Sequence, residues 1–343
     1  MSIDSQWHIE RSQKILKQYP EIRQYFGHYP RSILAIAFLV ALQWLIAWLV
    51  KDLPWCLVGA IAFCGGQFIL HSLGVFVHEA AHNLIFNHKL GSRFALWLIV
   101  CGSLSFGESL TYIGVHGKTH HLQLNDYQYD HELWDRNRVE FANNHLLWRI
   151  IESLLHLLPG GVIITEVMSS FLVDADSRQV KSAKLPLGFN FLLIITSLSL
   201  YTVAWYLLSP QATLYLFWSL TLMASNWGIT FHGQSITEHH IYQQGKTYST
   251  YSWTNIPLFN TGYHDEHHTF PNVPWIYLPK IKGIAAEYFT NDNPYSYFKW
   301  WWWWAKSAFA PIGYNRYLPE TNSANCQPGI NSLSTYSNSL QSD

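Results

Sequence analysis

The sequence predicts an all-α membrane protein with four transmembrane helices in two hairpins and a helical cap on one side of the membrane. Hydrophobic residues make up 49% of the 343 residues and charged residues only 13%, whereas soluble domains average about 25% charged residues. Four long apolar runs form two pairs, and a very short turn joins each pair. The polar segments outside these runs carry three clusters of histidine at helical spacing.

The first pair of apolar runs covers residues 32–50 and 55–77, and the second pair covers residues 187–208 and 212–231. A helix rises about 1.5 Å per residue, so about 20 apolar residues cross the hydrocarbon core of a bilayer. Each run is long enough for one crossing. Because so few residues separate the members of each pair, they are expected to be antiparallel neighbours.

Three further apolar stretches are predicted to contact the membrane without crossing it. Residues 94–106 are too few to cross the bilayer and are expected to form a re-entrant or interfacial segment. Residues 150–173 are interrupted by acidic residues and by a Pro-Gly-Gly turn. Five consecutive tryptophans at 300–304 stand between Lys299 and Lys306, and tryptophan is enriched where a bilayer meets water.

The distribution of positive charge predicts the orientation in the membrane. The first 31 residues carry five lysines and arginines, whereas the turn between the first two spans has only Lys51 and the turn at 209–211 has none. Segments rich in lysine and arginine stay on the cytoplasmic side. Both termini and all histidine clusters are therefore expected in the cytosol, with residues 1–31 as an N-terminal segment and residues 320–343 as a disordered tail.

The histidine clusters predict a metal centre. On a helix, positions three and four residues apart share one face, which allows several ring nitrogens to converge. The candidate ligands are His78, His82, His116, His120, His121, His239, His264, His267 and His268. Nine ligands are too many for one tetrahedral zinc but suit two six-coordinate ions. His71 and His232 are the candidates for side chains that orient the ligands from behind.

Other functions fit parts of this pattern. Residues 78–82, His-Glu-Ala-Ala-His, form the H-E-x-x-H motif of zinc proteases, with Glu79 as the general base. That assignment leaves the other two clusters unexplained. A metal transporter would place its site near the middle of the membrane, whereas these clusters lie outside the spans. The net charge of −1 and the absence of basic runs give no indication of a nucleic-acid partner.

The three motifs resemble the histidine boxes of the membrane fatty-acid desaturase and hydroxylase superfamily. They are H-x-x-x-H at 78–82, H-x-x-x-H-H at 116–121 and H-x-x-H-H at 264–268. Within this superfamily the chain is most similar to the sphingolipid Δ4-desaturases. That similarity extends to ILKQYPEI (15–22), VKDLPW (50–55), HEAAHNLIF (78–86), ITEHH (236–240), GKTYSTYS (245–252), NTGYHDEHHTFPNVP (260–274) and IAAEYF (284–289).

The resemblance implies a fatty-acid desaturase domain at residues 32–319, whose cytosolic cap holds two iron ions on the nine histidines. It implies O2 as cosubstrate and a lipid substrate, with a trans double bond formed at C4–C5 of a sphingoid base, as in the conversion of dihydroceramide to ceramide. Electrons would come from a separate carrier, either cytochrome b5 or ferredoxin. The expected location is the endoplasmic reticulum membrane in a eukaryote and the cytoplasmic membrane in a bacterium.

Two features depart from the sphingolipid subfamily. The second box has one residue more than the usual H-x-x-H-H, a spacing that alkane hydroxylases also have, and the stretch LQLNDYQYDHEL at 122–133 matches poorly. Desaturation of a fatty-acyl chain and hydroxylation at C4 or on an alkyl chain therefore remain alternative outcomes at the same metal centre.

Overall fold

The described residues fold entirely into helices and connecting loops. The computed structural model describes residues 1–105, 112, 115–174, 187–240, 247–290, 292–293, 295–310 and 312, without the side chains of Lys118, His239 and His240. Within these ranges the only β-type pairing is an isolated bridge between Ser249 and Asp292. The prediction of an all-α protein is confirmed. The predicted tail at 320–343 lies outside the described residues.

The helices follow one another along the chain with short connections. The α-helices are α1 (Ile3–Gln18), α2 (Ser32–Leu49), α3 (Trp55–Ile61), α4 (Gln67–Ala81), α5 (Lys89–Ser103), α7 (Arg136–Asn144), α8 (Leu146–Leu155), α9 (Gly161–Leu172), α10 (Leu187–Val203), α11 (Pro210–Met223), α12 (Ile229–Ser235), α13 (His264–Thr269), α14 (Leu278–Ile284) and α15 (Tyr297–Ser307). The short turns are η1 (Pro20–Tyr25), η2 (Ala62–Gly66), η3 (His116–His120), η4 (Ala204–Leu208), η5 (Ile236–His240), η6 (Trp253–Asn255), η7 (Trp275–Tyr277) and η8 (Ala286–Tyr288). Of these, η2, η3, η4 and η5 are π-helical.

Three of the described helices are long and apolar enough to cross a membrane. They are Ser32–Leu49 with 18 residues, Trp55–Ala81 with 27 residues and Leu187–Leu208 with 22 residues. The second continues from α3 through the π-turn η2 into α4, and it ends four residues beyond the predicted span. Because about 20 residues suffice to cross, the last turn of α4 carries the first histidine box past the apolar stretch.

The fourth predicted span, residues 212–231, is divided between two helices. The first, α11, has 14 residues and ends at Met223, and the second, α12, begins at Ile229. A turn separates them, in which a Cβ on Gly228 would stand 2.1 Å from the carbonyl oxygen of Met223. Only glycine fits such a close approach, so this tight turn between the two helices depends on Gly228.

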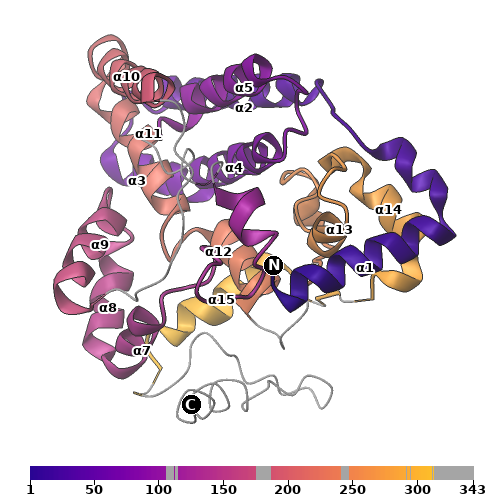
Figure 1. Cartoon of the computed structure of the whole chain (residues 1–343). Coiled ribbons are helices and arrows are strands. Elements are labelled where there is room, and N and C mark those ends of the chain that lie inside the picture. The colour runs from indigo at the N-terminus through magenta and orange to yellow at the C-terminus, as the bar shows by residue number, and fades with distance from the viewer. Residues whose placement is uncertain are drawn as a thin grey trace.

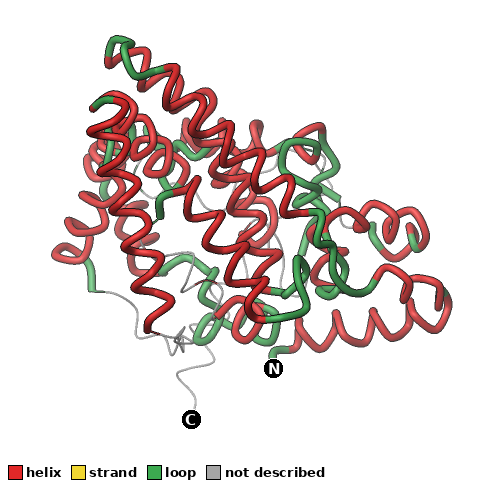
Figure 2. The backbone as a smooth tube through the Cα atoms, turned by 90° about the horizontal axis from the view of Figure 1, so that it is seen from above, coloured by secondary structure: helices red, strands yellow, loops and turns green. Residues whose placement is uncertain are grey.

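The long apolar helices lie together, and the remaining helices pack against them. In Figure 1, α2, α4, α5, α10 and α11 occupy the upper part, and α1, α13 and α14 lie together at the right. Figure 2, seen from above, shows the described residues as helices joined by loops. Residues 94–103 of the predicted re-entrant or interfacial segment form part of α5, which packs into a core with α2 and α4 through Ala95, Leu96 and Ile99. With 15 residues, α5 is too short to span.

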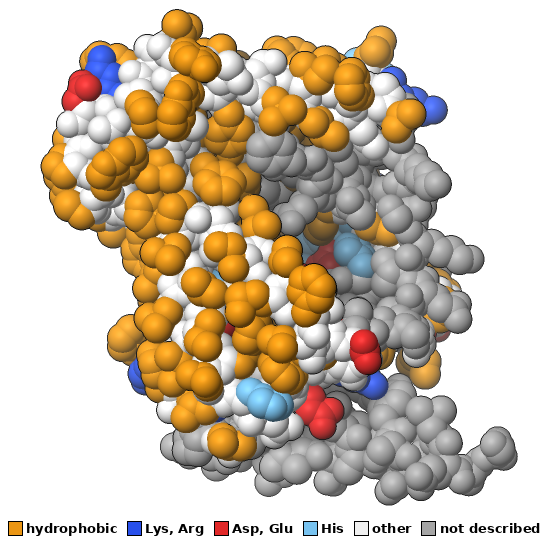
Figure 3. Space-filling model, turned by 90° about the vertical axis from the view of Figure 1, so that its left-hand side faces the viewer, with side chains coloured by type: hydrophobic (Ala, Val, Ile, Leu, Met, Phe, Trp, Pro, Cys, Tyr) orange, Lys and Arg blue, Asp and Glu red, His pale blue; other side chains and the backbone are white. Residues whose placement is uncertain are grey.

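The segment predicted to be interfacial, residues 150–173, lies in a hairpin of α8 and α9 joined at Gly160, whose φ is 77°. Several apolar side chains of this hairpin point outward, for example Leu154 and Phe171, which are 57% and 84% exposed. Figure 3 shows hydrophobic side chains over much of the visible face. Such a surface is typical of contact with lipid.

The tryptophan run forms most of α15 and is divided between the interior and the surface. Trp300 and Trp304 are buried against Ile236, whereas Trp302 is 56% exposed. The prediction of a membrane-interface run is therefore wrong for Trp300 and Trp304. Residues four apart share one face of a helix, and in α15 this face packs on α12.

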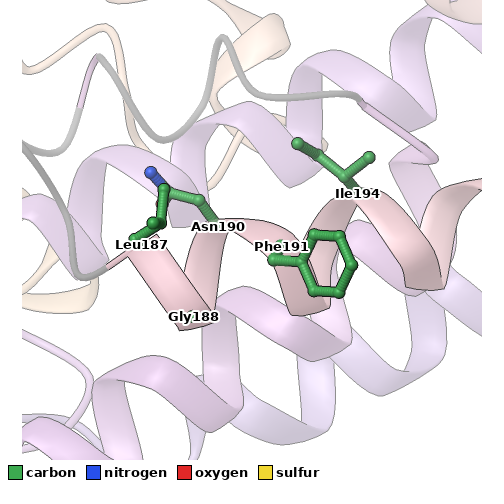
Figure 4. Close-up of a pocket in the computed structure, with 5 residues that line it drawn as sticks. All are labelled: Leu187, Gly188, Asn190, Phe191 and Ile194. Atoms are coloured by element: carbon green, nitrogen blue, oxygen red, sulfur yellow. The ribbon is translucent and has the colours of Figure 1, made fainter.

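An apolar pocket of about 390 Å³ lies at the beginning of α10. Its lining comprises Leu187, Gly188, Asn190, Phe191 and Ile194 (Figure 4). None of these residues belongs to a histidine box, so the pocket is separate from the candidate metal centre in its composition.

Candidate metal centre

The three histidine boxes come from three short segments far apart in the sequence. The last turn of α4 and its C-cap supply His78 and His82. The π-turn η3 and the residue after it supply His116, His120 and His121. The six-residue helix α13 supplies the third box, His264, His267 and His268. Each box therefore presents its rings from one turn of helix.

The structure brings eight of the nine predicted ligands together in two groups of ring nitrogens. The first group consists of His78, His82, His116, His121 and His267, and the second of His120, His264 and His268. Within each group the ligand atoms all lie within 4.8 Å of one another. Each group takes rings from more than one box, so neither can form without the packing of distant segments.

Close pairs of ring nitrogens lie at the centre of each group. The Nε2 atom of His121 is 3.2 Å from Nε2 of His116 and 3.2 Å from Nε2 of His267. In the second group, Nε2 of His120 is 3.2 Å from Nε2 of His268. The Nε2 atom of His82 is buried without a hydrogen-bond partner. These nitrogens converge as metal ligands do.

The π-turn explains why the second box is one residue longer than the third. The backbone N–H of His121 donates to the carbonyl of His116 over 3.3 Å, an i to i+5 bond, whereas an α-helix closes its turn from i to i+4. One turn of a π-helix therefore takes about one residue more. The longer box on η3 places His116 and His121 in the first group and His120 in the second.

The surroundings keep most of these imidazoles neutral, which is the form that binds metal. Desolvation lowers the pKa of His82 to about 3. It also lowers the pKa of His116, His121, His264, His267 and His268 well below the usual value. The exception is His120. Burial lowers its pKa, but the charges of Asp130 and Glu132 outweigh burial and raise it to about 9.

Three carboxylates lie behind the rings of the candidate ligands, and two of them are hydrogen-bonded to a ring nitrogen. The Nδ1 atom of His120 lies 2.9 Å from Oδ1 of Asp130, and Nδ1 of His116 is in close contact with Oε1 of Glu132. In the second group, Nδ1 of His264 lies 3.3 Å from Oε2 of Glu238. A carboxylate behind a histidine fixes the ring and makes it a stronger ligand.

The donor set fits divalent metal ions. Imidazole suits iron, zinc, copper and nickel, and each of the two groups could hold an ion. The first group alone offers five nitrogens, more than the four ligands of a structural zinc. The arrangement therefore favours ions of higher coordination number. Glu132 forms a third possible set of ligands with His116 and His120, whereas Asp130 and Glu238 belong to none of these sets.

The remaining predicted site residues have different positions. The backbone of His239 lies in η5, next to Glu238, but its side chain is outside the described residues. His71 bonds through Nε2 to Gln234 over 2.7 Å, and Gln234 donates to Oε2 of Glu238 over 2.8 Å. Because Glu238 lies next to His264, these contacts connect His71 to a candidate ligand. The role of His71 in orienting the ligands stays a prediction, which this geometry favours.

His232 lies elsewhere, outside the two described histidine groups. Its ring packs between Trp134 and Trp304, with centroid distances of 5.7 and 4.1 Å. These contacts belong to the aromatic core of α12 and α15, and they do not support a role in orienting ligands.

Sequence reasoning missed four side chains at the site. They are His8, Asp130, Glu132 and Glu238. His8 lies outside the three boxes, and Asp130 and Glu132 lie in the stretch 122–133 that matches the sphingolipid subfamily poorly. Their spacing of two residues, with a histidine between them, was the one available signal.

Glu79 has a structural role in this site. Its side chain is 2% exposed, and its Oε2 accepts a hydrogen bond from the backbone N–H of Trp275 over 3.3 Å. Glu79 belongs to neither histidine group. The contact joins the first box to the loop that follows the third box, and it places the carboxylate away from the position of a zinc-protease base.

Glu79→Gln is therefore expected to leave the metal content unchanged and to lower activity by less than about tenfold, because the amide oxygen can still accept from Trp275. Loss of a general base costs about 10²–10⁴-fold. Elemental analysis and a lipid-oxidation assay on the purified variant measure both quantities. A loss of lipid oxidation at the upper end of that range with full metal content would contradict a purely structural role for Glu79.

Comparison with known proteins gives the family. The model of the fatty acid desaturase family matches residues 52–304, which include all three histidine boxes. The chain belongs to the fatty acid desaturase family. A second model, that of the sphingolipid Delta4-desaturase (DES), matches residues 2–31. No solved structure matches the chain.

Curated relatives of this desaturase cover most of its length. The sphingolipid delta(4)-desaturase DES1 of Homo sapiens is 31% identical, covering 83% of each chain. The enzyme of the same name from Drosophila melanogaster is 30% identical over 82% of this chain and 83% of its own. The sphingolipid delta(4)-desaturase/C4-monooxygenase DES2 of Rattus norvegicus is 28% identical over 82% of each. The predicted resemblance is confirmed.

Proposed function

We propose that this desaturase introduces the trans C4–C5 double bond of a sphingoid base and so converts dihydroceramide to ceramide. The observation that carries the proposal is the gathering of eight box histidines into two groups in a chain whose relatives are named sphingolipid delta(4)-desaturases. The match of residues 2–31 to the sphingolipid desaturase model supports the same substrate class.

The metal in this proposal is a pair of iron ions held by the two histidine groups, with His239 as the ninth ligand. When bound, the irons supply the oxygen-dependent removal of hydrogen from a carbon too weakly acidic for any side-chain base. The protein holds the rings in place: Asp130 and Glu132 accept from the Nδ1 atoms of His120 and His116, and Glu238 lies next to Nδ1 of His264. The buried setting of the site keeps water away from the lipid carbon.

The membrane arrangement in this proposal has four crossings. The three long helices supply three of them, and α11 with the turn after it completes the fourth. The termini and the histidine boxes then lie in the cytosol, in agreement with the positive charge of the first 31 residues. Electrons come from a separate carrier, cytochrome b5 at the endoplasmic reticulum or ferredoxin at a bacterial cytoplasmic membrane.

Hydroxylation at C4 is the second candidate function. The rat relative is named a desaturase and a C4-monooxygenase, and the longer second box has the spacing that alkane hydroxylases share. Both outcomes begin with removal of hydrogen from the same region of the sphingoid base. They differ in whether a second hydrogen is lost or an oxygen atom is gained.

Expression in cells that lack ceramide unsaturation tests the proposal. Mass spectrometry is expected to detect sphingoid bases with one added double bond at C4, and none in cells that express the His267→Ala variant. Sphingoid bases with an added C4 hydroxyl would support the second candidate. Unchanged sphingoid bases beside newly unsaturated or hydroxylated acyl chains would contradict the substrate assignment.

A further inference from the structure

The third histidine box stands on a helix that cannot hold its shape alone. Helix α13 has six residues, and isolated helices of that length are not stable in water. It nevertheless supplies three ligand candidates to the two histidine groups. The two residues between its histidines, Asp265 and Glu266, are both 0% exposed. Their contacts therefore decide how the box is held.

Glu266 is held by the loop that precedes α13. The hydroxyl of Ser249 donates to Oε2 of Glu266 over 2.6 Å, and the hydroxyl of Tyr251 donates to Oε1. Ser249 Oγ also accepts from the backbone N–H of Asp265 over 3.0 Å. This side of the box is fixed from within residues 52–304, the region that matches the general family.

Asp265 is held from the other side by the N-terminal helix α1. Arg11 donates through Nη1 to Oδ2 over 2.9 Å and through Nη2 to Oδ1 over 2.6 Å, and Nη2 also lies 3.1 Å from the backbone oxygen of Asp265. Nη2 further donates to the hydroxyl of Thr269 at the end of α13. The two donors form the two-pronged arrangement that makes arginine a precise carboxylate ligand.

The side chain of Arg11 is also held by neighbours outside α13. Its guanidinium lies 4.2 Å from the ring centroid of Trp7 and 5.1 Å from that of Phe289. One turn earlier on α1, His8 lies with its ring 5.5 Å from the ring of His268. Nδ1 of His8 is 3.2 Å from Nη2 of Arg11, and its Nε2 is 3.4 Å from the hydroxyl of Thr247. Helix α1 thus lies directly against a candidate ligand.

We infer that helix α1 is a working part of the metal centre, in which Arg11 is a positioning residue that fixes the third histidine box through Asp265. The sphingolipid desaturase model matches residues 2–31, outside the general desaturase match at 52–304, so the contact joins a segment typical of the sphingolipid enzymes to the metal site. The inference rests on the proposed function in that the histidine groups are taken to bind iron.

The test uses the purified full-length protein loaded with iron and measures the rate at which a chelator removes it. Arg11→Met is expected to lose iron at least ~10-fold faster than the unaltered protein, since outer contacts of metal ligands are worth about 10–100-fold in metal affinity. Arg11→Lys keeps the charge but not the two-pronged geometry, and it is expected to lose iron at an intermediate rate. Glu10→Ala, on the exposed face of the same helix, serves as the matched control.

A double variant separates positioning from simple charge balance. If Arg11 only neutralises a buried carboxylate, Arg11→Met combined with Asp265→Asn restores the slow rate of iron loss. If Arg11 positions the box, the double variant stays fast. Should Arg11→Met fail to fold, Arg11→Lys alone decides, because a rate equal to that of the unaltered protein overturns the inference.

The iron measurement also distinguishes a failure of the proposed function from a failure of the proposed role of α1. An unaltered protein that binds no iron contradicts the proposed function. If the unaltered protein binds iron and Arg11→Met loses it at the same rate, only the role of α1 is contradicted. Neither result depends on which lipid is oxidised.

Discussion

Replacing His267 by alanine is expected to remove most of the iron of the first histidine group and to abolish lipid oxidation. The ring of His267 lies among those of three partners, with centroid distances of 4.3 Å to His78, 4.7 Å to His82 and 5.0 Å to His121. Alanine leaves a gap in the middle of the group. Because even outer partners of metal ligands cost about 10–100-fold, loss of this ligand is expected to exceed ~100-fold in activity.

Elemental analysis of the purified variant and lipid mass spectrometry of cells that express it measure the two effects. His145→Ala is the matched control, since His145 is exposed and bonds only locally, to the carbonyl of Phe141 over 2.8 Å. One zinc per chain, with a proteolytic activity that survives His267→Ala and is lost in Glu79→Ala, would contradict the iron centre and favour the protease.

Asp130→Asn is expected to weaken metal binding about 10–100-fold while the protein still folds. The carboxylate of Asp130 is fully buried and accepts from Nδ1 of His120 over 2.9 Å. Two backbone N–H groups hold the carboxylate, that of Asn125 over 3.0 Å and that of Glu132 over 3.1 Å. The asparagine keeps the shape but loses the charge that makes His120 a stronger ligand, and its amide nitrogen cannot accept one of these bonds.

Competition with a chelator of known affinity measures the change in metal binding. Asp126→Asn is the control from the same loop, because Asp126 accepts from the backbone N–H of Gln128 and belongs to none of the histidine groups. Equal metal affinities for the two variants would show that the carboxylate behind His120 contributes nothing to the site.

The sequence predicted well the features that depend on neighbouring residues. Span length follows from the run of apolar residues, and three of the four predicted spans are helices of sufficient length. Histidine spacing within each box follows from the helical repeat. Where a tertiary contact opposed the structure predicted from the local sequence, the tertiary contact prevailed. Gly228 divides the fourth run at a close backbone approach, and packing on α12 buries Trp300 and Trp304.

The sequence by itself determined the candidate chemistry of this protein, because residue types and their helical spacing identify candidate imidazole ligands and apolar spans without knowledge of distant contacts. Only the tertiary structure decided how the boxes divide into two groups, which carboxylates stand behind the rings, and that α1 reaches the third box. Arg11 and Asp265 are 254 residues apart in the chain. Contacts over such separations depend on how helices pack, and packing leaves no local pattern in the sequence.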